Sequence, residues 1–230
     1  MPANTKFTPP ARPSRVGGLL LASTYMDCTF QQRLICVAVI DKADDAIPLA
    51  RALSAGGLNT IEITFRTDAA AESIRLIRRE LPEMCVGAGT VLTPYQAAQA
   101  ADAGAHFLVA PGLDESVLQA ALVRNVLYIP GVVTPTEVGR ALALKLKLLK
   151  FFPAEVSGGV PMLKALVAPF AHTGVKFMPT GGITAATLAS YLALPSVAAV
   201  GGSWMAERDL ITKGEWARIT ALTAEAMKGL

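Results

Sequence analysis

Charged residues are scarce in this sequence. Asp, Glu, Lys and Arg make up 17% of the 230 residues, below the roughly 25% that is usual in soluble domains, whereas 52% of the residues are hydrophobic. So little charge indicates that part of the apolar surface is covered in an oligomer. The net charge is only +3, and no basic stripe alternates with aromatic residues. We therefore expect no nucleic-acid partner.

Cysteine and histidine are also rare. The three cysteines, Cys28, Cys36 and Cys85, are odd in number and do not have the spacing of metal ligands. The two histidines, His106 and His172, have no partner in the sequence pattern that would make either one a ligand or a general base. We therefore expect no metal site and no cofactor. The cysteine content favours a reducing, cytoplasmic location.

Long hydrophobic segments are absent as well. No apolar run approaches the roughly 18 to 20 residues that a membrane-spanning helix needs, so we expect no membrane partner. The segment from Arg12 to Leu21 has an apolar core of about six residues, shorter than the roughly 7 to 15 residues of a signal peptide. Residues 1–24, with four prolines among the first 13 positions, are instead expected to be a disordered leader.

What the sequence does contain is a repeated unit, in which a short apolar run is followed by a segment with helical periodicity. Threonine or a Thr-Pro pair precedes several of the helical segments, and glycine follows others, which are typical start and stop signals of helices. The apolar runs are Leu34–Ile40, Thr60–Phe65, Met84–Ala88, His106–Ala110, Val126–Pro130, Leu148–Phe152, Val175–Thr180 and Val197–Gly201.

Eight strands that alternate with helices predict a parallel sheet with crossover helices. The runs are apolar throughout, as expected for strands that are covered on both faces. At this length the sequence predicts an α/β fold, a (β/α)8 TIM barrel formed as one domain by residues 25–230, with Leu19–Gln32 as an additional N-terminal helical segment. A doubly wound open sheet is the alternative, but no G-x-G-x-x-G follows the first strand.

Lys150 lies in the middle of an otherwise apolar run, LLKFFPAE. Because strand side chains alternate between faces, Lys150 points the same way as Leu148 and Phe152. An ammonium group among apolar side chains loses hydration, and the neutral amine that this favours is the nucleophile that forms a Schiff base with a carbonyl compound. The alternative is a lysine at a strand end whose ammonium group reaches water.

Opposite charges lie on one face of the second predicted strand. Alternation places Glu62, Thr64 and Arg66 on that face and the apolar residues between them on the other. The apolar set is expected to face the helices, so the polar set should line the barrel. Opposite charges on an inward face are costly to bury unless they serve a ligand or each other. The alternative to a ligand-binding role is therefore a structural Glu62–Arg66 pair.

The ends of the next three strands carry small residues and turns. In the third strand, Val86-Gly87-Ala88-Gly89 leaves space, and Thr90 offers a hydroxyl group at the mouth of the barrel. The fourth and fifth strands end in Pro111-Gly112 and Pro130-Gly131, and we interpret the second of these pairs as a sharp turn.

Paired glycines follow the last two strands, at Gly181-Gly182 and Gly201-Gly202, and Ser203 comes directly after the second pair. Such pairs expose backbone N–H groups toward an anion. Barrels often bind phosphate at these strand positions. A lone Gly-Gly pair more often marks a tight turn, but two pairs here, the second followed by a hydroxyl donor, predict a phosphate site.

Seven strings at matching strand positions resemble a known family. They are IEITFRTDAA, VGAGTVLTP, APGL, IPGVVTPTE, KFFPAE, FMPTGGI and GGSWM, and they resemble the 2-keto-3-deoxy-6-phosphogluconate (KDPG) aldolases, which also act on 4-hydroxy-2-oxoglutarate (KHG). The resemblance covers the chain from about residue 25 onward. It implies a metal-free class I aldolase on a (β/α)8 barrel, usually a homotrimer. That enzyme cleaves KDPG to pyruvate and glyceraldehyde 3-phosphate in the Entner-Doudoroff pathway.

The resemblance also implies roles for single residues. Lys150 resembles the Schiff-base lysine, Glu62 the general acid/base, and Arg66 the clamp for the substrate carboxylate. The substrate contacts that it implies, with the phosphate at the glycine pairs, come from Thr90, Pro111, Phe152, Gly181, Gly182, Gly201, Gly202 and Ser203. Departures from the family pattern, such as Val156-Ser157 after PAE, touch no catalytic position.

Two other functions are compatible with the same barrel. A non-catalytic sensor of sugar phosphates would leave Lys150 without a purpose, and a metal-dependent aldolase would need ligands that the sequence does not offer. The sequence leaves open which phosphorylated or short keto acid is the physiological substrate.

Overall fold

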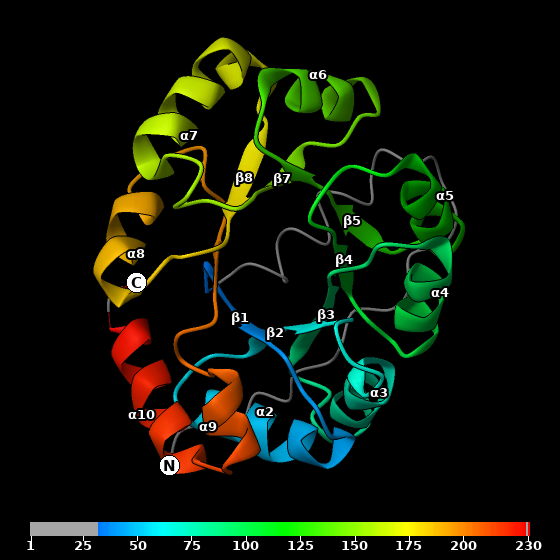
Figure 1. Cartoon of the computed structure of the whole chain (residues 1–230), viewed down its shortest axis with the longest axis vertical. Coiled ribbons are helices and arrows are strands. Elements are labelled where there is room, and N and C mark those ends of the chain that lie inside the picture. The colour runs from blue at the N-terminus through cyan, green and yellow to red at the C-terminus, as the bar shows by residue number, and fades with distance from the viewer. Residues whose placement is uncertain (1–31, 229) are drawn as a thin grey trace, which may run out of the picture.

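The strands of the computed structural model form a ring that is surrounded by helices (Figure 1). The structure describes residues 32–228 and Leu230. The strands are β1 (Leu34–Ala38), β2 (Thr60–Thr64), β3 (Cys85–Gly89), β4 (Phe107–Val109), β5 (Leu127–Ile129), β6 (Gly131–Val132), β7 (Leu148–Phe151), β8 (Lys176–Pro179) and β9 (Val200–Gly202).

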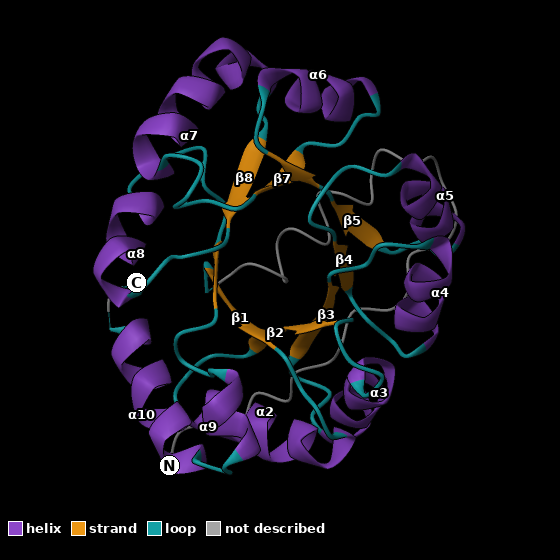
Figure 2. Cartoon of the chain, in the orientation of Figure 1, coloured by secondary structure: helices purple, strands orange, loops and turns teal. Residues whose placement is uncertain are grey.

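Helices alternate with these strands and lie on the outer side of the ring (Figure 2). The α-helices are α2 (Ala46–Ala55), α3 (Ala70–Glu80), α4 (Pro94–Asp102), α5 (Glu115–Val123), α6 (Pro135–Ala143), α7 (Gly159–Val167), α8 (Ala185–Leu192), α9 (Arg208–Thr212) and α10 (Trp216–Met227). Two 3-10 helices, η1 (Ala43–Asp45) and η2 (Ala168–Thr173), precede α2 and follow α7.

Paired strands in the ring run parallel. One sheet has the order β5-β4-β3-β2-β1-β9, and a second has the order β6-β7-β8. Isolated bridges between Phe177 and Val197 and between Thr180 and Gly201 join the two sheets on one side. On the other side, β5 is separated from β6 only by Pro130. Each of the eight predicted apolar runs therefore contributes a strand, and the prediction of an α/β fold with parallel strands in a curled sheet is confirmed.

The prediction of a sharp turn at Pro130-Gly131 is wrong. Gly131 begins the short strand β6 and pairs with Lys150 of β7. The chain changes its neighbour here because Pro130 has no N–H group to donate, while its carbonyl accepts the N–H of Lys150 at 2.8 Å. A Cβ atom at position 131 would lie 2.0 Å from the carbonyl oxygen of Pro111. This glycine therefore permits a close approach of two backbones.

Helix boundaries follow the signals in the sequence. The helices α4 and α6 begin at their prolines, directly after Thr93 and Thr134. The side chains of these two threonines accept hydrogen bonds from the backbone N–H groups of Gln96 and Glu137, at 3.2 and 3.3 Å. Each bond satisfies one of the donors that the first turn of a helix leaves without a partner.

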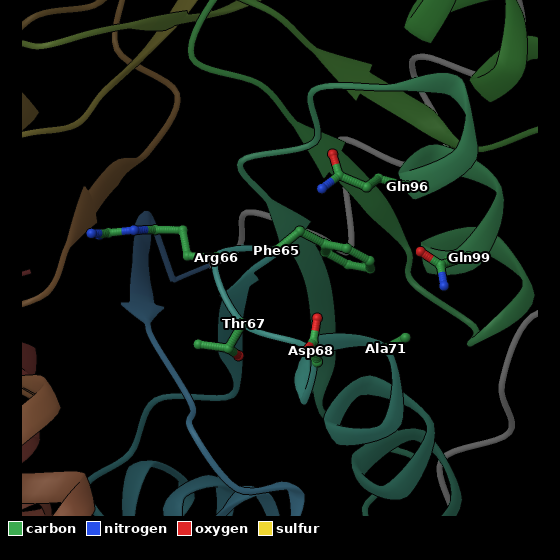
Figure 3. Close-up of a pocket in the computed structure, with 7 residues that line it drawn as sticks. All are labelled: Phe65, Arg66, Thr67, Asp68, Ala71, Gln96 and Gln99. Atoms are coloured by element: carbon green, nitrogen blue, oxygen red, sulfur yellow. The ribbon is translucent and has the colours of Figure 1, made fainter.

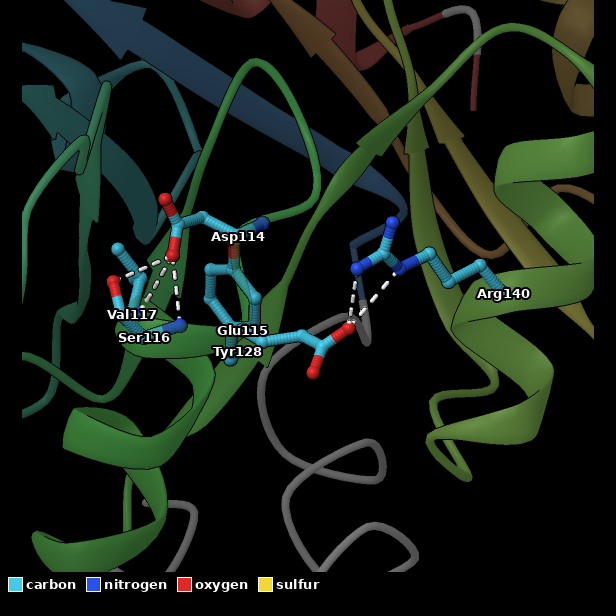
Figure 4. A network of polar contacts seen from close by, with 6 residues as sticks. All are labelled: Asp114, Glu115, Ser116, Val117, Tyr128 and Arg140. Carbon is cyan, nitrogen blue, oxygen red and sulfur yellow. Dashed lines mark hydrogen bonds and ion pairs between the residues drawn. The ribbon is translucent and has the colours of Figure 1, made fainter.

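Polar contacts tie the start of α5 to α6 on the outside of the ring (Figure 4). The Asp114 carboxylate accepts hydrogen bonds from the Ser116 hydroxyl at 2.6 Å and from the N–H groups of Ser116 and Val117 at 2.7 and 3.2 Å. These bonds lower the pKa of Asp114 below its ordinary value. The next residue, Glu115, accepts two hydrogen bonds from the Arg140 guanidinium, at 2.6 and 3.0 Å.

Buried apolar side chains cover both faces of the strands, as predicted. The larger set lies between the strands and the helices and includes Ile61, Ile63, Leu149 and Phe151. The smaller set comes from the opposite strand faces and fills the inside of the ring. Its buried members are Ile35, Phe107, Val109, Ile129, Leu148, Met178 and Ala199.

The predicted leader and the predicted N-terminal helical segment lie outside the described residues, apart from Gln32. The side chain of Gln32 donates a hydrogen bond to the carbonyl of Gly57 at 2.5 Å and accepts one from the N–H of Asn59 at 2.7 Å. These contacts fix the chain beside the loop that leads into β2. Among the helices that the structure describes, none has the length and apolar content to cross a bilayer.

Candidate active site

Lys150 and Glu62 form a buried ion pair inside the ring. The Nζ atom of Lys150 lies 3.4 Å from Oε1 of Glu62, and the two residues are 5% and 0% exposed. Lys150 follows Leu148 of the inner apolar set on the same face of β7 and pairs with Met178 of β8. The predicted alternation of side chains is confirmed in both strands. The alternative in which the ammonium group of Lys150 reaches water is therefore wrong.

The contacts around the Lys150–Glu62 pair affect the free energy that the burial of the two charges costs. Moving an ammonium and a carboxylate out of water is unfavourable, and their mutual attraction offsets this only with good additional contacts. The ammonium group of Lys150 lies 4.9 Å from the ring centre of Phe152, a cation–π contact. The second carboxylate oxygen of Glu62, Oε2, is buried and has no hydrogen-bond partner among the described residues. This oxygen can accept a hydrogen bond from an incoming group.

Gly89 of β3 provides the space for the Glu62 carboxylate. A Cβ atom at position 89 would lie 2.1 Å from Oε1 of Glu62 and 2.8 Å from its Cδ. Gly89 pairs with Thr64, two residues beyond Glu62 on the same face of β2. The small residues of the third strand therefore leave space, as predicted, and the carboxylate of the neighbouring strand occupies it.

A pocket of about 340 Å³ opens at the carboxyl ends of the strands. Phe152 links the pocket to the ion pair, because its side chain lines the pocket and its ring contacts Lys150. Thr64 also lines the pocket. The predicted site residues that line it are Arg66, Phe152, Gly181, Gly182, Gly201, Gly202 and Ser203.

The glycine pair after β8 forms a turn that other residues rarely adopt. Gly181 and Gly182 have φ angles of 103° and 79°, in the region that favours glycine. Within residues 32–228 and 230, the backbone N–H groups of Gly182 and Ser203 donate no hydrogen bond. Both residues line the pocket, so two backbone donors and the Ser203 hydroxyl are available to an anion. Gly202 has a packing role as well, since a Cβ atom there would lie 1.8 Å from the Trp204 ring.

Arg66 lines both this pocket and a second one, which Figure 3 shows. The second pocket, of about 300 Å³, is also lined by Phe65, Thr67, Asp68, Ala71, Gln96 and Gln99. Figure 3 shows the Arg66 side chain extending away from the two glutamines. Its guanidinium makes no ion pair or hydrogen bond with the part of the chain that the structure describes. The alternative of a structural Glu62–Arg66 pair is therefore wrong, because the partner of Glu62 is Lys150.

Thr90 and Pro111 are not among the residues that line the pocket of about 340 Å³. Thr90 is half-buried and has a φ angle of 54°, a left-handed conformation that is rare for a β-branched residue. Pro111 is exposed, and its carbonyl packs against Gly131. Their contacts with a substrate stay predictions.

The sequence pattern gives no indication of Arg208, which lines the same pocket as Ser203. Its guanidinium donates two hydrogen bonds to the carboxylate of Asp41, at 2.8 and 2.5 Å. These bonds lower the pKa of Asp41 below its ordinary value. The only available signal was position, since Arg208 lies five residues beyond Ser203 in the segment that follows the last strand, where barrel sites form.

The side chain of His106 makes a hydrogen bond with the backbone. Its Nδ1 atom accepts a hydrogen bond from the N–H of Val86 at 3.0 Å. Burial and the nearby Arg78 guanidinium lower the pKa of His106 to about 4, so the ring is neutral at pH 7. Within the described residues, no three His, Cys, Asp or Glu side chains gather as a group that could hold a metal ion.

Known proteins are similar to this chain in sequence and in the arrangement of their strands and helices. Residues 27–222 match the family model described as KDPG and KHG aldolase. The chain is 46% identical over 196 residues to the KHG/KDPG aldolase of Escherichia coli K12, which covers 85% of this chain and 91% of that protein. It is 45% identical over 205 residues to the 2-dehydro-3-deoxy-phosphogluconate aldolase of Treponema pallidum, covering 89% and 97% of the two chains.

A solved structure is similar along most of its length. It is the KDPG aldolase of Legionella pneumophila with pyruvate captured at low pH as a covalent carbinolamine intermediate. The two structures agree with a TM-score of 0.82 and 40% sequence identity, over 87% of this chain and 96% of the other. At this identity the likeness extends to sequence as well as to the arrangement of strands and helices.

We expect Gly89→Ala to destabilise the protein by roughly 1 to 3 kcal/mol, the usual cost of overpacking, because the new methyl group would displace the Glu62 carboxylate. Denaturant unfolding measures this change. Gly139→Ala in α6 is the matched control, since open space surrounds its Cβ position. Alanine there should be neutral or stabilise the helix by roughly 0.5 to 1 kcal/mol. Equal unfolding free energies for the two variants would show that position 89 has spare room.

Proposed function

Since the chain belongs to the KDPG and KHG aldolase family, we propose that Lys150 is the nucleophile of a class I aldolase. The enzyme is a lyase that reversibly cleaves KDPG to pyruvate and glyceraldehyde 3-phosphate, and KHG to pyruvate and glyoxylate. The observation that supports the proposal most is the buried contact of Lys150 with Glu62, 3.4 Å long, next to a pocket with anion-binding donors. This chemistry belongs to carbohydrate metabolism in the Entner-Doudoroff pathway.

The proposal extends to the architecture of the whole chain. In this proposal the curled ring of strands is a (β/α)8 barrel that forms one domain. The active form is a homotrimer in the cytoplasm, without a cofactor or a metal. The low charge content, at 17% of residues, supports an oligomer that covers apolar surface.

The first step is the formation of the imine. The carboxylate of Glu62 removes a proton from the Lys150 ammonium, and the resulting neutral amine attacks the C2 ketone of the substrate. Glu62 returns this proton to the C2 oxygen, which gives the carbinolamine. It then moves a second proton from the Lys150 nitrogen to the C2 hydroxyl group, which leaves as water. The product is a protonated imine between Lys150 and C2. The buried location of the pair favours this exchange, because charge separation is poorly solvated there.

The second step breaks the C3–C4 bond. Glu62, again a carboxylate, takes the proton of the C4 hydroxyl group, the C3–C4 electron pair moves into the protonated imine, and the aldehyde departs. Glu62 gives its proton to C3 of the enamine, and water hydrolyses the imine to release pyruvate and Lys150. One carboxylate serves every transfer, and the unpartnered Oε2 atom of Glu62 supports this role.

Two groups orient the substrate around this bond. Arg66 has a guanidinium without a partner in the described part of the chain, and a planar fork of this kind holds a carboxylate with two hydrogen bonds. The N–H groups of Gly182 and Ser203 and the Ser203 hydroxyl bind the phosphate at the other end. Binding energy from the phosphate orients the reacting bond, although it does not take part in the chemistry.

The sequence is also compatible with two alternatives, a non-catalytic sensor of sugar phosphates and a metal-dependent aldolase. A sensor needs the anion-binding donors, but it gains nothing from a buried ammonium and carboxylate, which are costly to keep. Turnover of KDPG in the presence of a chelator would argue against both the sensor and a metal-dependent aldolase.

Borohydride reduction in the presence of pyruvate should attach one carboxyethyl group to Lys150, because it reduces the imine to a stable secondary amine. Peptide mass mapping locates the modified residue. Lys150→Arg should abolish the labelling, since a guanidinium stays protonated. Lys147→Arg, a change at a lysine that donates to the carbonyl of Thr173 on the surface, should retain it. Labelling at Lys147 or Lys164 in place of Lys150 would refute the assignment.

Glu62→Gln should lower kcat by roughly 10² to 10⁴, the usual contribution of a general acid/base. Glutamine keeps the shape of the side chain, so the thermal unfolding temperature should change little compared with the loss of activity. Steady-state kinetics and a melting curve on the same preparation separate the two effects. A kcat near that of the wild type would leave Glu62 as a structural partner of Lys150 only.

Ser203→Ala should lower kcat/KM for KDPG about 10- to 150-fold, because one hydrogen bond to a charged group contributes roughly 1.5 to 3 kcal/mol. Cleavage of KHG should fall much less, since KHG has no phosphate group. Kinetics with both substrates test this difference. Equal losses on the two substrates would mean that Ser203 supports its loop and does not bind the phosphate.

A further inference from the structure

Glu155, in the loop after β7, and Tyr191 of α8 are joined by a short hydrogen bond. Tyr191 is 0% exposed, and its hydroxyl donates to Oε1 of Glu155 at 2.6 Å. Burial, and next the bond to Glu155, raise the pKa of Tyr191, so the hydroxyl keeps its proton and remains a donor. A buried tyrosine hydroxyl that has one charged partner fixes the position of that partner.

Backbone hydrogen bonds bind the same loop to the glycine turn after β8. The N–H of Thr180 donates to the carbonyl of Phe151 at 3.0 Å, and the N–H of Ala154 donates to the carbonyl of Thr180 at 2.8 Å. The N–H of Glu155 then donates to the carbonyl of Gly181 at 3.0 Å. The pairing of β7 with β8 thus continues past the ends of both strands, up to the residues that line the pocket.

The side chain of Glu155 packs directly against the glycine turn. A Cβ atom at Gly182 would lie 2.8 Å from Cβ and 3.0 Å from Cγ of Glu155. The Glu155 side chain therefore lies in contact with the backbone of the residue whose N–H group is available in the pocket. If the carboxylate of Glu155 lost its partner, this contact would loosen, and the turn would gain freedom to move.

The loop that carries Glu155 also carries a contact of Lys150. Phe152 lies three residues before Glu155, and its ring is 4.9 Å from the Lys150 ammonium. This loop therefore contacts the nucleophile through Phe152 and the glycine turn through Glu155. Helix α8, which carries Tyr191, begins three residues after Gly182, so the hydrogen bond closes a loop of chain around the turn.

We propose that Glu155 and Tyr191 are positioning residues that hold the Gly181-Gly182 turn, and with it the phosphate end of the substrate, at a fixed place relative to Lys150. This inference rests on the function proposed above. Neither residue touches the reacting atoms. They act through the binding energy of the phosphate group. This energy orients the C3–C4 bond only if the phosphate site keeps a fixed position relative to the imine.

A purely structural role of the Glu155–Tyr191 pair predicts a different result. A buried hydrogen bond that served only stability would lower the unfolding temperature when removed and would leave the ratio of the two activities unchanged. The positioning role requires a loss that depends on the phosphate group. Comparison of KDPG with KHG therefore distinguishes the two roles, whatever the change in stability.

The test begins with Tyr191→Phe, which removes the hydroxyl and keeps the ring in its buried place. We expect kcat/KM for KDPG to fall roughly 3- to 30-fold and kcat/KM for KHG to change by less than about 2-fold. Tyr95→Phe is the matched control, because Tyr95 lies on α4 and is 71% exposed, and in the described part of the chain its hydroxyl accepts a hydrogen bond only from Gln99. It should leave both activities unchanged.

Variants of Glu155 complete the test. Glu155→Gln keeps an oxygen that accepts the Tyr191 hydrogen bond and should retain most of the KDPG activity. Glu155→Ala should lose about as much as Tyr191→Phe, and the double variant should lose no more, since both changes remove the same interaction. Trapping of pyruvate on Lys150 by borohydride should remain in every variant.

Two outcomes with an active wild type would overturn the inference. Equal losses on KDPG and KHG would show that the pair supports the fold without positioning the turn. Losses that multiply in the double variant would show that the two residues do not act through one interaction. A wild-type protein that cleaves neither substrate would overturn the proposed function, and this inference with it. Failure of the inference alone is distinguishable from failure of the proposed function, because it is observed only with an active wild type.

Discussion

The contact between Lys150 and Glu62 is the constraint on which the rest of the structure depends. An ammonium and a carboxylate inside a ring of apolar side chains are stable only when each has a partner at close range. Gly89 gives the carboxylate its space, and Phe152 places an aromatic face beside the ammonium. Below the pair, the inner apolar set closes the ring to water. The fold can keep these charges because the neighbouring strand β3 leaves space for the carboxylate and Phe152 contacts the ammonium.

Strand β7 and the loop after it supply a residue to each part of the site. Leu148 belongs to the inner apolar set, Lys150 to the ion pair and Phe152 to the lining of the pocket. The step of two residues is the period of a β-strand, so each of these side chains points inward. Glu155 follows where the strand has ended and the backbone hydrogen bonds with the neighbouring turn continue. One short segment therefore contributes to the inner apolar set, to the ion pair and to the lining of the pocket.

Local patterns in the sequence were sufficient for the strands, the helix starts and the inward direction of Lys150 and Glu62. Periodicity and capping signals act within a few residues, which is why they can be read from one chain. The partner of Glu62 could not be predicted, because Lys150 is 88 residues away in the sequence. The contact of Arg208 with Asp41 spans 167 residues. Gly131 was misjudged for the same reason, since its role depends on the carbonyl of Pro111 in another loop.

The pairing of β1 with β9 joins the first described strand to the last. During synthesis on the ribosome, β1 to β5 can pair in the order in which they emerge, but one edge of β1 has no neighbour until residues 200–202 have been made. An open strand edge can pair with another chain. Contacts between such distant segments also slow folding, because the ends of a long loop must meet. The nascent protein is therefore exposed to aggregation until its last strand closes the ring.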